Sequence, residues 1–140
     1  MDTKRLMRDT RARLILAHPF FGFPSMNLEL QEDPACETMA TNGVILKYNP
    51  EWIVKLGDTE RQTAIAHEAA HCMLGHVFRR FGRDMEIWNQ ACDYVVNEHL
   101  KANGFVLAPD ALYDLKYQGM PAEQVYDKLR RTPPNQRPSQ

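Results

Sequence analysis

The stretch IAHEAAHCMLGH, residues 65–76, decides how the rest of this sequence is interpreted. It places His67 and His71 four residues apart, with Glu68 directly after the first, among alanine, isoleucine, leucine and methionine. Such an apolar run is typical of a buried helix. Burial of ionisable side chains is unfavourable unless they have partners. The sequence therefore indicates that these three side chains interact with something inside the folded protein.

The spacing of the two histidines suits a metal ion. On an α-helix, residues i and i+4 lie on the same face about one turn apart, so both imidazoles can reach one ion. Glu68 is offset by one residue and can reach the open side of that ion. Two imidazoles bind Zn²⁺ well, and a catalytic zinc keeps one position for a water molecule whose proton a nearby carboxylate can accept. We therefore predict His67 and His71 as zinc ligands and Glu68 as a general base.

The pattern itself is short, because only three of its five positions are fixed and chance matches occur in unrelated proteins. Its setting makes chance the weaker explanation. Two histidines and a glutamate inside an apolar helix would destabilise the fold if nothing paired with them. We therefore expect this helix to carry a metal site.

The motif supplies two ligands, and His76 is one candidate for the third. On an unbroken helix His76 lies about 140° from His71, away from the shared face. Zinc enzymes with a third histidine soon after the motif have the spacing H-E-x-x-H-x-x-G-x-x-H. Here Gly75 comes one position late and His76 one position early. We expect His76 to lie behind the ligands or on the surface, unless Gly75 breaks the helix.

A better candidate for the third ligand is Asp93, on a second predicted helix at residues 85–102. Asn89, Asp93 and Asn97 lie at i, i+4 and i+8 and form a polar stripe. A polar stripe often faces solvent. This helix already has another hydrophilic side, formed by Glu86, Gln90, Glu98 and Lys101. We therefore expect the stripe to face the histidines, with Asp93 on the metal and Asn97 holding a ligating histidine through its outer nitrogen.

These motifs give the sequence a family resemblance. It resembles the zinc metallopeptidase domain (HExxH family) found in bacterial proteins ahead of a von Willebrand factor A-like domain. The similarity extends to about Leu129 and includes NGVILKYNPEW, AHEAAHCMLGH, RDMEIWNQACDYVVNEHL and GMPAEQVYDKL. After the histidine motif, its most specific part is the WNxAxDxxxN block at residues 88–97. Residues 1–140 contain no von Willebrand factor A-like segment, so we expect a stand-alone form of the domain.

The resemblance implies a zinc metallopeptidase in which His67, His71 and Asp93 hold the metal and Glu68 is the general base. The helix at residues 85–102 is also similar to the second helix of thermolysin-type zincins, which presents an acidic ligand and a polar residue one turn later. The oxyanion of the reaction needs a donor besides the metal. The candidates, which the sequence does not rank, are Tyr94, His99, His76 and Tyr117.

The favoured function is zinc-dependent hydrolysis of a peptide or protein substrate, with Glu68 assisting the attack of zinc-bound water on the peptide bond. An alternative that uses the same ligands is a zinc-stabilised binding or regulatory module without turnover. The two differ in whether Glu68 matters for activity but not for folding. A nucleic-acid-binding regulator is disfavoured by a formal net charge of −1.

The remaining segments predict an α+β, zincin-like fold in which a small sheet or hairpin packs on a helical bundle. Helices are predicted at residues 3–17, 51–56, 60 to about 80, 85–102 and 121–131. A capping box of Thr59 and Gln62 starts the helix that carries the histidines. The proline- and glycine-containing segment His18–Ser25 ends the first helix and is predicted to interrupt helical structure.

Two strands are predicted, at residues 26–30 and 43–49, with a turn at Thr41-Asn42-Gly43 before the second. We expect the second strand to form the edge of the sheet, where an extended peptide can add as a further strand. Residues 132–140 are polar and rich in proline, which predicts a disordered tail and leaves residues 1–131 as the domain.

Composition sets the broad class. A chain of 140 residues with 44% hydrophobic and 25% charged residues is ordinary for one soluble domain. Its three cysteines lack Cys-x-x-Cys spacing, which argues against a disulfide framework and a thiolate zinc finger. The sequence shows neither a signal peptide nor a run long enough to span a bilayer. We expect a cytoplasmic protein without membrane or nucleic-acid partners, and the oligomeric state is not indicated.

Overall fold

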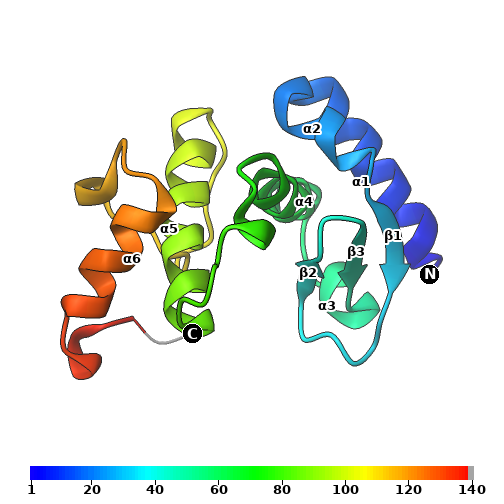
Figure 1. Ribbon diagram of the computed structural model, residues 1–140. Coiled ribbons are helices and arrows are strands. Elements are labelled where there is room, and N and C mark those ends of the chain that lie inside the picture. Colours follow the sequence, from blue (N-terminus) through cyan, green and yellow to red (C-terminus); the bar gives the residue numbers. More distant parts are fainter. Residues whose placement is uncertain (139–140) are drawn as a thin grey trace. The chain divides into compact units, whose positions relative to one another are not determined.

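The chain forms two units that meet in sequence directly after the histidine motif (Figure 1). The computed structural model describes residues 1–138, of which Met1–Val77 form the first unit and the residues from Phe78 onward the second. Six α-helices and one three-stranded sheet occur within the described residues, which confirms the α+β class. Across these residues no helix combines the length and apolar character needed to cross a bilayer.

The first unit begins with two helices, α1 (Thr3–Ala17) and α2 (Pro19–Ser25), shown in blue in Figure 1. The Asp2 carboxylate caps α1 by accepting a hydrogen bond of 3.1 Å from the backbone N–H of Arg5. The prediction that α1 ends near His18 is confirmed, but the prediction of an interruption up to Ser25 was wrong. Pro19 lies in the first turn of α2, where a helix tolerates proline.

A side chain of α1 holds the C-terminal end of α2 in place. The Arg11 guanidinium donates from Nη1 to the carbonyl oxygens of Ser25 at 3.1 Å and Leu28 at 2.8 Å. The Ser25 carbonyl also accepts from the backbone N–H of Leu28, so the guanidinium ties the turn that follows α2 to α1. The two helices also approach closely, because Gly22 of α2 lies against the backbone of Ile15 of α1.

The sheet consists of β1 (Glu29–Glu32), β2 (Met39–Thr41) and β3 (Ile45–Tyr48), in the order β1-β3-β2. β2 and β3 pair antiparallel across the expected turn, where Asn42 Oδ1 accepts from the N–H groups of Val44 and Ile45 and Gly43 has φ +94°. The predicted hairpin turn is therefore present.

Three other predictions about the sheet were wrong. The first strand lies at 29–32 rather than 26–30, and it pairs with β3 in parallel rather than as the other arm of the hairpin. β3 is consequently the central strand of the sheet, not an edge. The edge next to the hairpin turn belongs to β2, whose three residues are too short a run for alternation to reveal.

The helix that carries the histidine motif is α4 (Asp58–Met73), which follows the short helix α3 (Pro50–Val54). Its N-terminal cap differs from the prediction, because Glu60 Oε1 accepts from the Gly57 N–H at 2.9 Å while Gln62 donates to Asp58 at 2.7 Å. It also ends earlier than expected, at Met73 rather than near residue 80. Gly75 has φ +70°, a conformation that glycine adopts without strain, and a 3₁₀ turn, η1 (His76–Phe78), follows.

One face of α4 is buried in the first unit, and the other is not. The buried face consists of Ile65, Ala66, Ala69 and Ala70. α2 and β2 pack against α4, and its small alanines permit a close approach. The prediction that α4 is buried on all sides was wrong, since the opposite positions, which include both histidines, are half-buried. The core of this unit also contains the fully buried side chains of Met7, Leu14, Leu46, Tyr48 and Ile53.

The second unit is built on α5 (Met85–Ala102), which packs against α6 (Ala122–Arg131). The predicted end of α5 is confirmed, because Asn103 follows it and Gly104 has φ +88°. The Arg83 guanidinium lies over the rings of Trp88 and Tyr126, 5.4 and 5.7 Å from their centroids. These contacts join the start of α5 to α6.

An ion pair and a hydrogen bond fix the ends of the second unit. Arg79 pairs with Glu123 of α6, and this hydrogen-bonded guanidinium lowers the pKa of the Glu123 carboxyl. Gln90 was expected on a hydrophilic side of α5, but it is buried and donates to the carbonyl of Pro138 at 2.8 Å. Part of the predicted disordered tail forms a 3₁₀ turn, η3 (Pro134–Gln136), and residues 139–140 lie outside the described residues.

The close approach of α1 and α2 yields a stability prediction. A Cβ at Gly22 would lie 2.5 Å from the Ile15 Cα, so Gly22→Ala should force the two helices apart. We expect a loss of about 1–3 kcal/mol in the free energy of unfolding, although alanine is the better helix former. Urea denaturation measures this loss.

The matched control is Gly57→Ala, where the added methyl group meets only Glu60 Oε1, at the far end of a side chain, at 3.3 Å. It should change the free energy of unfolding by less than about 1 kcal/mol. A Gly22→Ala protein as stable as the unmodified chain would show that α1 and α2 are not tightly packed at this point.

Candidate metal centre

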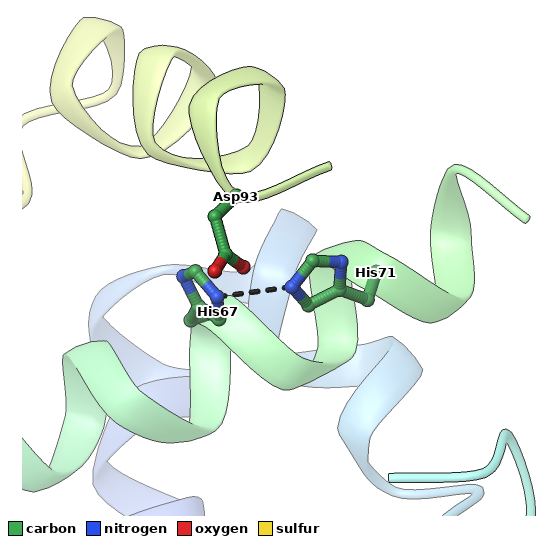
Figure 2. A group of neighbouring side chains, drawn as sticks. All are labelled: His67, His71 and Asp93. Atoms are coloured by element: carbon green, nitrogen blue, oxygen red, sulfur yellow. Dashed lines mark hydrogen bonds between the residues drawn. The ribbon is translucent and has the colours of Figure 1, made fainter. Parts of the chain in front are cut away.

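The two histidines of α4 point their outer nitrogens at one another. His67 Nε2 and His71 Nε2 lie 3.0 Å apart, with the rings inclined at 76° (Figure 2). Two nitrogens that each bind a tetrahedral zinc at about 2.0–2.1 Å are roughly 3.3 Å apart. The pair is therefore arranged as two ligands of one ion would be, and both rings offer Nε2 rather than Nδ1.

The other nitrogen of His71 faces His76. The two Nδ1 atoms lie 3.1 Å apart, and the His76 side chain is only 4% exposed. The helix does break at Gly75, as the rival possibility for His76 required. The break nevertheless brings His76 to the Nδ1 side of His71, opposite the nitrogen that faces His67. His76 thus contacts the side of the His71 ring that faces away from His67, and it does not lie beside the two Nε2 atoms.

Glu68 lies on the side of α4 that faces the sheet. Glu68 and Cys72 are four residues apart on α4 and therefore lie on the same side of the helix. Burial raises the pKa of the Cys72 thiol, and the negative charge of Glu68 raises it further. Cys72 Sγ in turn lies 3.7 Å from Thr41 Oγ1 on β2. The carboxylate expected to act as the base therefore occupies the face of α4 next to the edge strand, one residue away from the ligand pair.

Asp93, the third ligand that the sequence predicts, lies on α5 in the second unit, whereas His67 and His71 lie on α4 in the first unit. All three side chains are of the kind that can bind a metal ion, and all three are half-buried. The role of Asp93 at a metal stays a prediction.

A comparison with protein families shows where the chain belongs. A family model with the description "Putative metallopeptidase domain" matches residues 3–139. The chain belongs to this family. The match covers nearly the whole sequence and confirms the family resemblance. No curated protein and no solved structure matches the chain.

The polar stripe of α5 is not one continuous surface in this metallopeptidase-family chain. Asn89 is exposed, whereas Asn97 is buried and donates from Nδ2 to the Leu112 carbonyl at 2.8 Å. That bond holds the loop after α5 against the helix. The roles of Asn89 and Asn97 next to a ligand stay predictions.

The candidate oxyanion donors are dispersed. The Tyr94 ring packs edge-on against the buried Tyr117, with centroids 4.9 Å apart, and burial raises the pKa of Tyr94. His99 is exposed near the end of α5. None of these observations assigns a donor.

Two features of the site were not specified from the sequence. His76 was expected behind the ligands or on the surface, but its contact with His71 Nδ1 was not predicted, because that contact depends on the break at Gly75. The other is Thr41, which lies in a strand too short to be recognised from its pattern. Both depend on where the chain turns after a regular element, and backbone turns are harder to locate from a sequence than helices are.

The geometry of the histidine pair predicts how the chain takes up metal. The unmodified protein should bind about one Zn²⁺ per chain, and His67→Ala or His71→Ala should each abolish tight binding, because two ligands remain at most. Elemental analysis after dialysis against zinc measures the stoichiometry.

His99→Ala is the matched control, since this histidine is exposed on α5. It should retain one zinc per chain. Full uptake by the His67→Ala protein would mean that the pair is not the metal site.

Proposed function

We propose that the chain is a zinc-dependent peptidase in which His67, His71 and Asp93 hold the metal and Glu68 is the general base. The observation that carries the proposal is the 3.0 Å separation of the two Nε2 atoms on the helix where Glu68 follows His67. Two imidazoles and one carboxylate fit a catalytic zinc, which leaves a fourth position open. Bound zinc would supply Lewis acidity and lower the pKa of a water molecule to about 7.

Glu68 has the chemistry and the position of a proton acceptor. A carboxylate beside the ligand pair can take a proton from the attacking water and pass it to the nitrogen of the leaving amine. Its place on the β2 side of α4 puts this proton transfer on the same side as the open strand edge. Because Glu68 does not share the ligand face, it can perform this step without competing for the metal.

The sheet suggests an extended peptide as the substrate. Backbone bonds from Asn42 to Ile45 and from Asn49 to Thr38 show that Ala40 pairs inward with β3. In an antiparallel ladder the alternate residues, Met39 and Thr41, then direct their main-chain groups away from β3. A peptide could add to this edge of β2 as a further antiparallel or parallel strand. Such an arrangement would make the first unit zincin-like, with β2 in the position that the sequence assigned to β3.

The role of Glu68 is tested by Glu68→Gln, which keeps the volume of the side chain but removes the proton acceptor. We expect zinc content and the circular dichroism spectrum to stay unchanged while peptide cleavage falls by about 10²–10⁴-fold. Cleavage is measured by mass spectrometry on a peptide library. Glu51→Gln, at an exposed position of α3, is the matched control and should cleave at the normal rate.

Equal peptide cleavage by the Glu68→Gln protein and the unmodified protein would exclude Glu68 as the base. If the unmodified chain binds zinc but cleaves no peptide, the function is that of a zinc-stabilised binding module, which uses the same ligands without turnover.

The third ligand is tested by Asp93→Ala. Loss of a residue that only supports a ligand typically lowers metal affinity about 10–100-fold, so loss of a ligand should lower it by at least about 100-fold. Competition with a coloured chelator measures the dissociation constant. Asp127→Ala, at an exposed position of α6, should not change it. An unchanged zinc dissociation constant for Asp93→Ala would show that Asp93, and with it the second unit, is not part of the metal site.

A further inference from the structure

His76 lies next to the pair His67 and His71 and has no role in the proposed reaction. It is the first residue of η1 and is buried, whereas Val77 and Phe78 after it are exposed. Its ring lies 5.3 Å from the ring of His71, inclined at 63°, with the two Nδ1 atoms 3.1 Å apart. A polar side chain that is buried in this way is held in one orientation by its surroundings, so the contact is a defined one.

The contact matters for the tautomer of His71, because one of the two Nδ1 atoms must donate and the other must accept. A neutral imidazole has one N–H donor and one acceptor nitrogen, and only the acceptor nitrogen can bind a metal. His71 directs Nε2 toward His67, so metal binding at this point requires the proton of His71 to lie on Nδ1. That proton then points at His76 Nδ1, which must act as the acceptor. His76 in turn carries its own proton on Nε2.

We propose that His76 is a positioning residue, which accepts the Nδ1–H hydrogen bond of His71 and thereby fixes the tautomer and ring orientation that present Nε2 to the metal. Metal-bound histidines commonly donate their second N–H to a carboxylate, a carbonyl or water. Here another imidazole takes that place. The inference rests on the part of the proposed function that assigns metal to the histidine pair, and it does not require peptide hydrolysis.

The backbone at Gly75 makes the contact possible. On a continuous helix His76 would lie about 140° around the axis from His71 and could not reach its ring. The left-handed conformation of Gly75, with φ +70°, ends α4 and returns the chain so that His76 faces Nδ1. Any other residue at this position would adopt that conformation with strain. Gly75 therefore contributes to the site without a side chain.

The test compares two substitutions of His76. His76→Leu keeps a buried side chain but removes the acceptor, whereas His76→Asn offers Oδ1 close to the position of the lost Nδ1. We expect His76→Leu to raise the zinc dissociation constant about 10–100-fold and His76→Asn to restore most of the affinity. The exposed His99→Leu is the control for the loss of a histidine and should leave the constant unchanged.

A second measurement does not involve metal. Long-range ¹H–¹⁵N NMR of the metal-free protein identifies the tautomer of each imidazole. The Nδ1–H form should dominate for His71 in the unmodified chain and in His76→Asn, and it should lose this dominance in His76→Leu. Circular dichroism of each variant confirms folding. Should His76→Leu fail to fold, the unmodified protein and His76→Asn still report the tautomer.

Three results would overturn the inference: a His71 that carries its proton on Nε2 in the unmodified protein, an unchanged zinc dissociation constant in folded His76→Leu, or equal losses in His76→Leu and His76→Asn. A chain that binds zinc and follows the expected order of affinities, but cleaves no peptide, would refute the proposed hydrolysis and support the role of His76. If the unmodified chain binds no zinc, the proposed function fails, and the tautomer of His71 alone decides the inference.

Discussion

The candidate site depends on two imidazoles held four residues apart on one helix that is only partly buried. Full burial would strip His67 and His71 of solvent without leaving a path for a metal ion, and full exposure would leave their rings free to rotate. α4 avoids both extremes, because its alanine face packs inside the first unit while the histidine face remains half-buried. The helix is thus anchored by small apolar residues, and their size decides how closely α2 and β2 approach it.

Long helices with clear end signals could be predicted from the sequence, and so could the ligand pair. α5 begins and ends as expected, because Asp84 caps it and Asn103-Gly104 terminates it. The histidine motif predicted its own geometry because the i, i+4 relation is a property of any helix. The candidate third ligand, Asp93, followed from a polar position on a largely apolar helix, and its role stays a prediction.

The features that could not be predicted depend on a single residue or on contacts distant in sequence. Gly75 could have continued α4 or broken it, and only the fold decides between these conformations. The pairing of β1 with β3 in parallel arises from the path of the chain through residues 33–38, which carry no periodic pattern. The helix at Pro19–Ser25 combines proline and glycine with three aromatic rings, and its packing against α1 and α4 outweighs its low intrinsic helix propensity.

The shortness of β2 has a consequence for selectivity. In this strand of three residues, only Met39 and Thr41 direct their main-chain N–H and C=O groups away from β3. Copies of the chain therefore gain little by joining edge to edge, which limits aggregation through this strand. A peptide added to this edge, as proposed, would likewise receive its direction and register from very few main-chain bonds. Discrimination between one amino-acid sequence and another would then depend on side chains around the proposed cleavage point rather than on main-chain pairing with β2.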